Sequence, residues 1–469
     1  MKSALFPAER NAIIVISLTA SAIAVLPVVP RLWAIGLLAS LPVAAWMISN
    51  SVAWLGLFLG AVLLLPPLPI SVGNSGAHPA LLLAAFGVYA SFLFAHRWTF
   101  ARSPVSAPLA ALTAFIVASV PMALTYSGAD IALGSAARVL LFAIAPFVFA
   151  YVVAGPGQTL AACRFGPAKL LFAAGVLSAL FACVDFFYQL PAPSGYSPQF
   201  IWLADRVLRR AQGFFYDAGA LGNMCAFFLV MVGAVLLTPN RRGINRWWAV
   251  AGAVPLATAL ILSYSRASVL TVGVSVVAML CVLRRDVKWV RTAVSIAAAG
   301  ALVAIIVSSL APGLAQWWWQ RAQKTLDLAF SASDAALSGR VSSWQTIASF
   351  TVAHPLRAIL GVGYKTLPYS DVLGEPVIAD NTYLSVFIET GIGGLAALCA
   401  LHVAILRTTY RAARSVDPVT AFYGVWAFSF WVGEVVQMGA ADLLTYWRLL
   451  PVFFFIIAIA VLKARERSA

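Results

Sequence analysis

Three arginines stand close together before an apolar run in the sequence ADRVLRRAQGFFYDAGALGN, residues 204–223. They are Arg206, Arg209 and Arg210. An arginine fork binds oxygens in pairs, so these residues, with nearby backbone N–H groups, could hold a phosphate or pyrophosphate. Asp217 follows just inside the apolar run. The alternative is that the arginines extend along a membrane edge toward lipid headgroups.

A single arginine, Arg266, lies in a very short turn between two apolar runs, in the sequence ILSYSRASVL, residues 261–270. No acidic residue stands near it in the sequence. It therefore either binds an anionic group of a substrate or pairs with an acid from another apolar run, such as Asp217 or Glu434.

Two polar residues, Asp380 and Asn381, stand where the chain returns to apolar sequence, in ADNTYLSVFIETGIGGL, residues 379–395. Asp and Asn are typical helix caps at such a position, and a general base is the alternative role for Asp380. Glu389 is nine residues further on, which is the opposite face of an ideal helix. Both carboxylates therefore face one cavity only if the helix begins after Asp380. The glycines of residues 391–394 predict close helix packing.

The stretch between residues 312 and 381 is the long part of the chain that is not continuously apolar. Within it, residues 317–324, WWWQRAQK, combine three tryptophans with Arg321 and Lys324. Indole rings prefer the membrane interface, so we predict an amphipathic segment there. Stacking of the tryptophans on sugar rings is the alternative.

A helix is predicted for SGRVSSWQTIASF, residues 338–350, with Ser338 as its N-cap. Arg340 would lie in the first turn, where the helix dipole disfavours a cation, so we expect it to have a specific partner. The sequence AHPLRAILGVGYKTLP that follows predicts a helix end and a Gly-rich turn. We interpret His354 before Pro355 as a loop-packing residue, with a general base as the alternative.

The composition indicates which elements must position these residues. Of 469 residues, 62% are apolar and 10% are charged, and the mean hydropathy is +0.92, whereas a soluble domain has about 25% charged residues. The many long apolar runs predict a polytopic, all-helical membrane protein. The net charge of +15 comes from basic residues scattered in short loops, which argues against nucleic-acid binding. The five cysteines are far apart, so neither disulfides nor a zinc site is expected.

We predict about fourteen membrane spans, with twelve or thirteen as the alternative because one span is short and one turn is tight. Their approximate ranges are 11–29, 32–48, 52–70, 79–95, 107–125, 136–153, 168–190, 214–237, 247–263, 267–283, 290–311, 382–406, 419–438 and 446–462. The predicted organisation is a first group of spans in residues 1–311, an outer loop region in 312–381, and a last group in 382–469.

The basic residues also predict the orientation of the chain. If the N-terminus is cytoplasmic, the short cytoplasmic loops contain most of the lysines and arginines, and both termini lie inside. The long loop then lies on the outer side. Several acids fall near outer ends of spans, where an ionisable group needs a cavity or a partner. They are Asp185, Asp217, Glu389, Glu434 and Asp442.

The order of these motifs resembles the O-antigen polymerase/ligase family of the bacterial envelope, which contains Wzy-type polymerases and lipopolysaccharide ligases. The likeness covers roughly residues 200–400. The matching elements are Arg210 with Gly213, Ser265 with Arg266, Arg340 with Trp344, His354 with Pro355, the Gly-Val-Gly of residues 361–363, and residues 381–395 with Asn381, Tyr383 and Glu389.

The resemblance implies a fold of the GT-C type and a metal-independent glycosyltransferase that needs no cofactor. Its donor is a glycan on undecaprenyl pyrophosphate, bound at the periplasmic side of the inner (cytoplasmic) membrane, so the long loop would be periplasmic and carry amphipathic helices. Arg210 and Arg266 would hold the pyrophosphate, with Arg340 as a third candidate. Ligases typically have a histidine before the asparagine of the last motif. This chain has Asp380 there, which favours a polymerase.

We therefore expect polymerisation of lipid-linked oligosaccharide repeat units, with inversion at the anomeric carbon. The residues expected to be catalytic are Asp380, Arg266 and Arg210. Those expected to bind substrate are Arg209, Arg340, Asp217, Asn381, Tyr383, Glu389 and His354. The expected partners are the lipid-linked donor and acceptor and membrane lipid, with a chain-length regulator as a further candidate. One alternative is a ligase that moves the glycan to lipid A-core or protein. The other is a flippase or transporter of lipid-linked oligosaccharides, which internal repeats would favour.

Overall fold

The computed structural model describes residues 46–47, 50–68, 71–72, 75–99, 103–193, 195–202, 207–238, 243–283 and 340–465, with isolated positions between 305 and 323. Several sequence predictions fall outside these residues. They are the span 11–29, most of the spans 32–48 and 290–311, and the residues Arg206, Trp317, Trp318, Arg321, Lys324 and Ser338.

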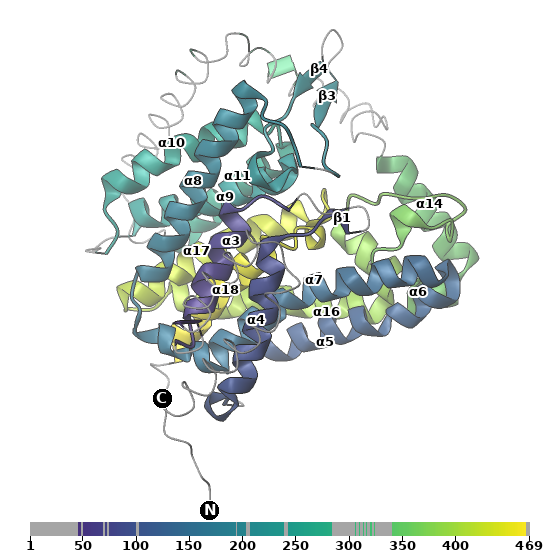
Figure 1. Ribbon diagram of the computed structural model, residues 1–469, viewed down its shortest axis with the longest axis horizontal. Coiled ribbons are helices and arrows are strands. Elements are labelled where there is room, and N and C mark those ends of the chain that lie inside the picture. Colours follow the sequence, from purple (N-terminus) through teal and green to yellow (C-terminus); the bar gives the residue numbers. More distant parts are fainter. Residues whose placement is uncertain are drawn as a thin grey trace, which may run out of the picture.

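The described chain is mostly helical (Figure 1). Its α-helices are α3 (Ala53–Leu64), α4 (Pro79–Leu93), α5 (Ser106–Ala118), α6 (Val120–Ser127), α7 (Ala129–Val153), α8 (Gly166–Tyr188), α9 (Ala218–Leu237), α10 (Arg246–Leu262), α11 (Arg266–Leu283), α14 (Arg340–Ala353), α15 (Pro355–Leu360), α16 (Thr382–Ala413), α17 (Pro418–Gln437) and α18 (Leu450–Arg465). The 3₁₀ segments are η2 (Ala95–Arg97), η3 (Pro156–Ala162), η4 (Gly213–Phe215), η5 (Leu367–Tyr369) and η6 (Leu443–Thr445). Two antiparallel hairpins pair β1 (Ser71–Val72) with β2 (Ser75–Gly76) and β3 (Phe200–Trp202) with β4 (Val207–Arg209).

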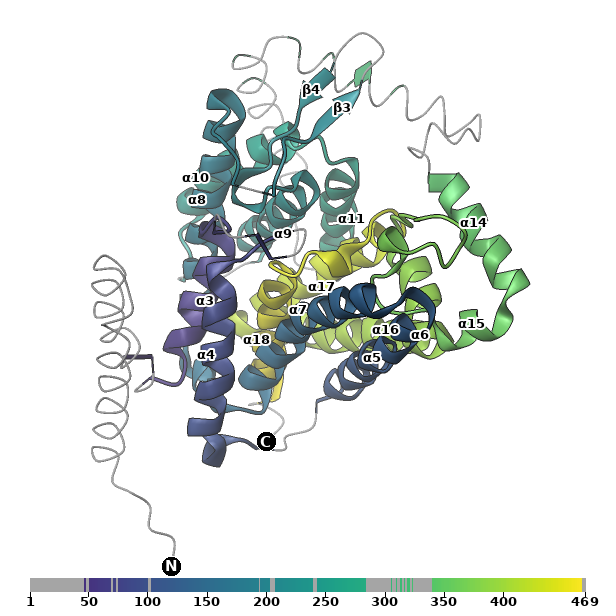
Figure 2. The same cartoon turned by 45° about the vertical axis from the view of Figure 1, so that its right-hand side comes forward.

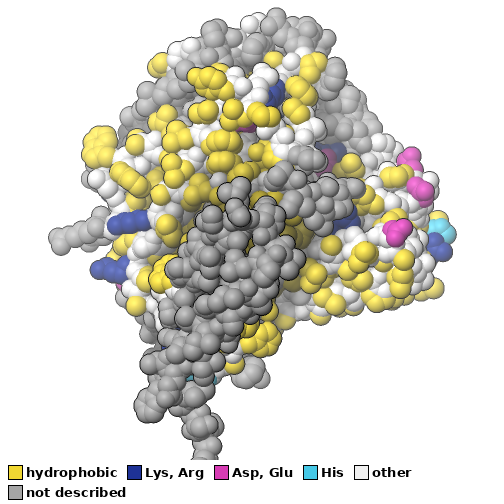
Figure 3. Space-filling model, viewed as in Figure 1, with side chains coloured by type: hydrophobic (Ala, Val, Ile, Leu, Met, Phe, Trp, Pro, Cys, Tyr) yellow, Lys and Arg dark blue, Asp and Glu magenta, His cyan; other side chains and the backbone are white. Residues whose placement is uncertain are grey.

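Seven segments within the described residues are long and apolar enough to cross a membrane. They are the run Ser106–Ser127, which contains α5 and α6, together with α7, α8, α9, α11, α16 and α17. Helices α3, α4 and α10 are shorter and also apolar. The predicted class, an all-α membrane protein, is therefore confirmed. Hydrophobic side chains dominate the visible described surface, as expected for contact with lipid (Figure 3).

The start of α7 differs most clearly from the predicted span. The helix begins at Ala129, well before the predicted start at residue 136. Its first turns carry Ser135, which falls outside the predicted span, and Arg138, which falls inside the predicted span of residues 136–153. Both side chains find acceptors inside the protein: the Ser135 hydroxyl donates to the Tyr364 carbonyl at 2.6 Å, and Arg138 Nη1 donates to the Lys365 carbonyl at 3.3 Å.

Helices α16 and α17 pack along each other near the centre of the described structure (Figures 1 and 2). Helix α5 packs on α16, α11 on α17, and α18 on both α17 and α7. Much of the core is aromatic: the Phe227 ring lies 4.6 Å from Trp426, 4.8 Å from Phe430 and 4.7 Å from Phe453, measured between centroids. This core holds the ends of the membrane helices in fixed relative positions.

The Gly-rich turn of residues 361–365, GVGYK, inserts between the helices rather than staying in the outer loop. The backbone N–H of Val362 donates to the carbonyl of Ile388, and that of Gly363 to the carbonyl of Glu389, both at 3.0 Å. Irregular backbone is tolerated at such a place when protein groups satisfy its hydrogen bonds. The insertion brings Lys365 to the side of α16.

A kink in α16 makes room for this insertion. Gly391 has φ +76°, which interrupts the helix and frees the carbonyls just before it. A Cβ atom on Gly391 would lie only 2.1 Å from the carbonyl oxygen of Ile359, so a side chain here would displace α15. The predicted role of this glycine in close packing is confirmed, with α15 as the partner.

The described part of the outer loop forms two helices instead of the single predicted one. Helix α14 begins at Arg340, ends at Ala353 and is followed directly by α15. Apolar residues that include Ile347, Phe350 and Ala358 pack with Ile388 of α16 in a small separate core. The loop is therefore attached to the membrane helices by packing.

Candidate active site

A cavity of about 1530 Å³ lies where the N-terminal ends of several helices meet. Its walls include the first residues of α9, α11 and α16, the start of α14, the segment from Tyr364 to Asp380, and residues 440–447. Five of the site residues predicted from the sequence line it. They are Arg210, Asp217, Arg340, Asp380 and Glu389.

Arg210 presents an incompletely bonded guanidinium group to the cavity. Its Nε donates to the Ser263 carbonyl at 2.8 Å, while its Nη groups have no hydrogen-bond partner among the described residues. Burial lowers the pKa of Arg210 from its ordinary value, and the charges of Asp217 and Tyr446 act in the opposite direction. A partly buried cation with open donors is stabilised by an anionic ligand.

Asp217 is first of all a helix cap. Its Oδ1 accepts a hydrogen bond from the Ala220 N–H at 2.6 Å, and its Oδ2 accepts one from Gln199 Nε2 at 3.2 Å. The sequence suggested that Asp217 lies just inside the span, whereas in the structure it precedes α9. Its carboxylate lies at the cavity edge and fixes the start of α9 there.

The turn that carries Arg266 is built by side-chain and backbone contacts. Tyr264 takes a positive φ of 52°, and the Ser265 N–H donates to Ser263 Oγ at 3.3 Å. Arg266 is the first residue of α11, and its neighbours Ser265 and Ala267 line the cavity. It lies close enough to Arg210 and Arg340 to be repelled by both positive charges.

Arg340 and Asp380 form an ion pair on the cavity wall. Arg340 Nε donates to Asp380 Oδ2 at 3.1 Å, which supplies the partner that its helix position led us to expect. The side chain of Asp380 is 43% exposed, and its Oδ1 receives no hydrogen bond from the described residues. Asp380 has a φ of +44° and precedes α16, so it and Glu389 face the same cavity.

Asn381, and not Asp380, caps α16. Asn381 Oδ1 accepts from the N–H groups of Tyr383 and Leu384 at 3.0 and 3.1 Å, and Nδ2 donates to the Gly439 carbonyl at 3.0 Å. The Tyr383 hydroxyl donates to the Val435 carbonyl at 2.7 Å. The side chains of Asn381 and Tyr383 thus hold α16 against the end of α17, next to the cavity.

A buried charged cluster around Lys365 adds residues that the sequence predictions did not include. Lys365 Nζ pairs with Asp442 Oδ2 and lies 3.9 Å from Glu389 Oε2. The Ser385 hydroxyl also donates to Asp442 Oδ2, at 3.1 Å. All four residues line the cavity. Asp442 was noted only as an acid near the outer end of a span.

Arg138 and Tyr446 are two further cavity residues that the predictions missed. The Arg138 guanidinium lies 4.0 Å from the centre of the Tyr369 ring. An ionisable residue inside an apolar helix is itself a signal of function, and that signal could have identified Arg138. Tyr446 packs so closely on α9 that a Cβ on Gly219 would lie 2.2 Å from its hydroxyl. Its position has no signal in the sequence, because it depends on packing between distant elements.

Two predicted residues lie elsewhere. Arg209 points away from the cavity lining and pairs with Asp185 at 3.4 Å. His354 is exposed between α14 and α15, where its ring lies 5.0 Å from that of Phe350. This placement agrees with the loop-packing interpretation of His354.

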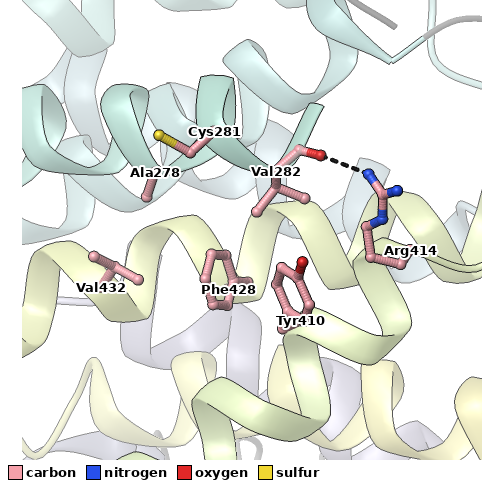
Figure 4. Close-up of a pocket in the computed structure, with 7 residues that line it drawn as sticks. All are labelled: Ala278, Cys281, Val282, Tyr410, Arg414, Phe428 and Val432. Atoms are coloured by element: carbon pink, nitrogen blue, oxygen red, sulfur yellow. Dashed lines mark hydrogen bonds between the residues drawn. The ribbon is translucent and has the colours of Figure 1, made fainter. Parts of the chain in front are cut away.

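A second hollow, of about 510 Å³, is different in character. It lies between the C-terminal parts of α11 and α16 and the middle of α17 (Figure 4). Its lining contains one charged residue, Arg414, whose Nη1 donates to the Val282 carbonyl at 3.0 Å. The remaining lining residues carry no carboxylate. The larger cavity combines arginines with carboxylates and is therefore the candidate active site.

Comparison with known families bears on the same region. Residues 251–399 match a family model described as O-antigen ligase (Wzy_C). No curated protein matches the chain. The matched range contains Arg266, Arg340, Asp380 and Glu389, while Arg210 precedes it. The predicted resemblance of the chain to the O-antigen polymerase/ligase family, a family of membrane enzymes of glycan transfer, is therefore confirmed over residues 251–399.

Proposed function

We propose that the protein is a membrane glycosyltransferase that polymerises oligosaccharide repeat units carried on undecaprenyl pyrophosphate, with the larger cavity as its active site. One observation carries this proposal. Arg266 and Arg340 are each the first residue of a helix, where the helix dipole disfavours a cation. Arg210 and Arg340 line the cavity, and Arg266 lies between two lining residues, Ser265 and Ala267. A dianionic pyrophosphate would offset three cations and the N-terminal ends of α9, α11, α14 and α16 together.

The chemistry follows from this distribution of charge. A hydroxyl group of the acceptor sugar attacks the anomeric carbon of the donor, and the bond from that carbon to the pyrophosphate oxygen breaks. The hydroxyl proton goes to Asp380 Oδ1, which is free to accept it. Undecaprenyl pyrophosphate leaves with the bonding electrons, and the configuration at the anomeric carbon inverts. Asp380 acts as general base within hydrogen-bond reach of the acceptor.

The arginines stabilise the leaving group. Negative charge grows on the pyrophosphate as the glycosidic bond breaks, and fixed donors aimed at that charge lower the barrier. Arg210 is already oriented by the Ser263 carbonyl, and its Nη groups face the cavity. Arg266 and Arg340 complete the clamp. We propose that these cations make a metal ion unnecessary, so that turnover is insensitive to chelators.

Substrate positioning falls to the residues around this clamp. Asp217 and Asn381 keep the ends of α9 and α16 in place, and Tyr383 holds α16 on α17. Glu389, paired with Lys365 in the cavity wall, is available to sugar hydroxyls. We assign no substrate contact to Arg209, which pairs with Asp185, or to His354, which is exposed between α14 and α15.

The proposed architecture extends beyond the described helices. We propose about fourteen spans in a GT-C-like arrangement in the bacterial inner membrane, with both termini cytoplasmic and the cavity on the periplasmic side. Residues 312–381 would form the periplasmic region between the first and last groups of spans. A chain-length regulator would meet the protein on that side.

A ligase is the second candidate, and the description of the matching family supports it. A ligase uses the same donor and the same arginine clamp but transfers the glycan to lipid A-core or protein. The identity of the acceptor thus separates the two functions, while the cavity chemistry is common to both.

The test uses the purified full-length protein in liposomes with a synthetic undecaprenyl-pyrophosphate-linked repeat unit. A polymerase gives longer undecaprenyl-linked glycans and releases undecaprenyl pyrophosphate, and it does so with EDTA present. In a parallel reaction with lipid A-core, a ligase moves the glycan to the new acceptor. Absence of both products, with the donor intact, would contradict a transferase function.

A further inference from the structure

Tyr446 lines the cavity, and its hydroxyl has no hydrogen-bond partner among the described residues. It lies in the turn between η6 and α18, where its N–H donates to the Leu443 carbonyl at 3.1 Å. Its own carbonyl accepts from the N–H groups of Leu449 and Leu450 at 2.8 and 3.1 Å. These bonds fix the backbone from which the side chain projects. A tyrosine hydroxyl away from bulk water usually has a partner, so this open hydroxyl indicates a ligand in the cavity.

The first turn of α9 leaves space for the hydroxyl. A Cβ atom on Gly219 would overlap the Tyr446 hydroxyl, and it would lie 3.1 Å from Asp217 Oδ1. The hydroxyl therefore lies beside the cap of α9, yet Asp217 Oδ1 accepts from the Ala220 N–H and forms no hydrogen bond with Tyr446. The N-terminus of a helix carries partial positive charge. This charge favours the lone pairs of the phenol oxygen on the helix side and directs the O–H bond toward the cavity.

Tyr446 is also close to the charged groups of the proposed reaction. The charges of Asp217, Arg210, Glu434 and Asp380 all act on its phenol, and the charge of Tyr446 acts in turn on Arg210. Arg210 is proposed to hold the pyrophosphate, and Asp380 is proposed to take the proton of the acceptor. A donor group near both residues is well placed for the bond between the anomeric carbon and the pyrophosphate oxygen.

We propose that the Tyr446 hydroxyl is a further catalytic group, which donates a hydrogen bond to the pyrophosphate oxygen that leaves the anomeric carbon. This inference rests on the proposed function, because the pyrophosphate is the leaving group of that reaction. A phenol ionises near pH 10, far above the pH at which a phosphate group does, so the proton stays on Tyr446. Negative charge grows on the oxygen as the bond breaks, and the hydrogen bond strengthens with it.

The first test is Tyr446→Phe, which removes the hydroxyl and keeps the ring. We expect kcat to fall about ten- to a hundredfold, the loss expected for one hydrogen bond to a charged group. KM should change little, because the contact strengthens only as the bond breaks. The thermal midpoint should also stay the same, because the hydroxyl has no partner in the described protein. Tyr188→Phe is the matched control, since Tyr188 is 77% exposed at the end of α8.

A double-mutant cycle tests the position of the hydroxyl without relying on one variant. Gly219→Ala places a methyl group where the hydroxyl lies, so it should lower kcat about as much as Tyr446→Phe does. In the Tyr446→Phe protein the hydroxyl is already gone. There, Gly219→Ala should change kcat by less than about twofold, because the two residues act through one contact.

A fluorinated tyrosine at position 446 supplies a readout that a packing role would not affect. Its phenol ionises at a lower pH than that of tyrosine, and an ionised phenol donates no hydrogen bond. Turnover should therefore be lost as the pH rises through this ionisation, in a range where the wild-type protein remains active. Tyr446→Phe should show no such loss.

Full kcat in Tyr446→Phe would overturn the assignment, and so would an equal loss in Tyr188→Phe. Additive losses in the cycle, or a fluorinated protein with the pH profile of wild type, would also contradict a hydrogen bond from Tyr446. In each of these cases the wild-type protein still makes product. Absence of product from the wild-type protein would instead contradict the proposed function.

Discussion

Two arginines, Arg210 and Arg448, differ in how many of their N–H groups are hydrogen-bonded within the protein. Arg210, three residues before η4, has one hydrogen bond to a backbone carbonyl and exposes its Nη groups to the cavity. Arg448 lies behind the cavity wall, and every nitrogen of its guanidinium donates to backbone. Its acceptors are the carbonyls of Val62, Leu65 and Phe214. Burial lowers the pKa of Arg448 to about 9.

The difference shows that burial of a cation does not by itself identify an active-site residue. Arg448 joins the end of α3 to η4 and the start of α18, and backbone carbonyls accept hydrogen bonds from four of its five N–H groups. Arg210 is oriented by one bond and keeps its remaining donors open. The same contrast separates Asp380, which has an open Oδ1 on the cavity, from Asp217, whose two oxygens both accept protein hydrogen bonds. Open groups are expected to affect turnover, and fully bonded groups are expected to affect stability.

The largest effect is expected from Asp380→Asn. The amide cannot accept the acceptor's proton, so we expect kcat to fall about 10²- to 10⁴-fold, the range of general base catalysis. The thermal midpoint should change little, because the side chain is partly exposed. Asp371→Asn, an exposed carboxylate of the same loop, is the control. Undiminished product from Asp380→Asn would remove the base assignment and leave Asp380 a structural role beside Arg340.

Arg448→Met is expected to lower stability and to leave kcat unchanged, which is the opposite of the effect expected from Asp380→Asn. The substitution leaves the buried carbonyls of Val62 and Phe214 without donors, and each orphaned group costs about 1–3 kcal/mol. We therefore expect the free energy of unfolding to fall by about 2–6 kcal/mol, measured as a lower thermal midpoint in detergent. Protein that remains folded should keep its kcat. A normal thermal midpoint with lost turnover would reverse the contrast with Arg210.

A smaller loss of stability is expected when the pH is lowered, and it comes from His78, which lies next to Arg448. The ring is neutral: Nε2 donates to the Leu65 carbonyl at 3.0 Å, and Nδ1 accepts from the Ala80 N–H at 3.1 Å. Burial, and then the charge of Arg448, lowers the pKa of His78 from 6.5 to about 3. The unfolded chain binds a proton below about pH 6.5 and the folded one does not, so stability is full above that pH and falls below it.

The measurement is the thermal midpoint of wild type, His78→Gln and His354→Gln between pH 7 and pH 5. The loss attributable to His78 approaches about 1.4 kcal/mol per pH unit well below pH 6.5. His78→Gln should show a flatter dependence than wild type. His354→Gln, which changes an exposed ring, should follow wild type. Parallel curves for all three proteins would show that His78 is not a source of the acid sensitivity.

The fold class was predictable because composition and long apolar runs indicate that a chain is surrounded by lipid, where only helices and closed barrels are stable. Arg340 could be linked to a partner from sequence, since a cation in the first turn of a helix conflicts with the dipole. The condition that α16 begin after Asp380 was also derivable, and the structure meets it. Such inferences are local, because they depend on spacing within one element.

The missed residues depend on contacts between distant elements. Lys365 reaches Asp442 only because the Gly-Val-Gly segment inserts at the kink of Gly391. From the sequence alone, a Gly-rich turn is predicted to be a surface loop, so this contact was missed. Arg209 and Arg210 are adjacent in sequence and equivalent in type, yet the β3–β4 hairpin turns one toward Asp185 and the other toward the cavity. Register in a short hairpin sends neighbouring side chains to opposite faces, and the sequence does not specify that register.

This adjacent pair allows the most direct test of the arginine clamp. The measurement is the Kd of undecaprenyl pyrophosphate, the leaving group itself, for wild type, Arg210→Ala and Arg209→Ala in liposomes. A hydrogen bond to a charged group contributes about 1.5–3 kcal/mol, so Arg210→Ala should weaken binding about ten- to a hundredfold. Arg209→Ala should leave the Kd unchanged. Equal affinities for wild type and Arg210→Ala, or a larger loss in Arg209→Ala, would contradict the assignment of the cavity as the pyrophosphate site.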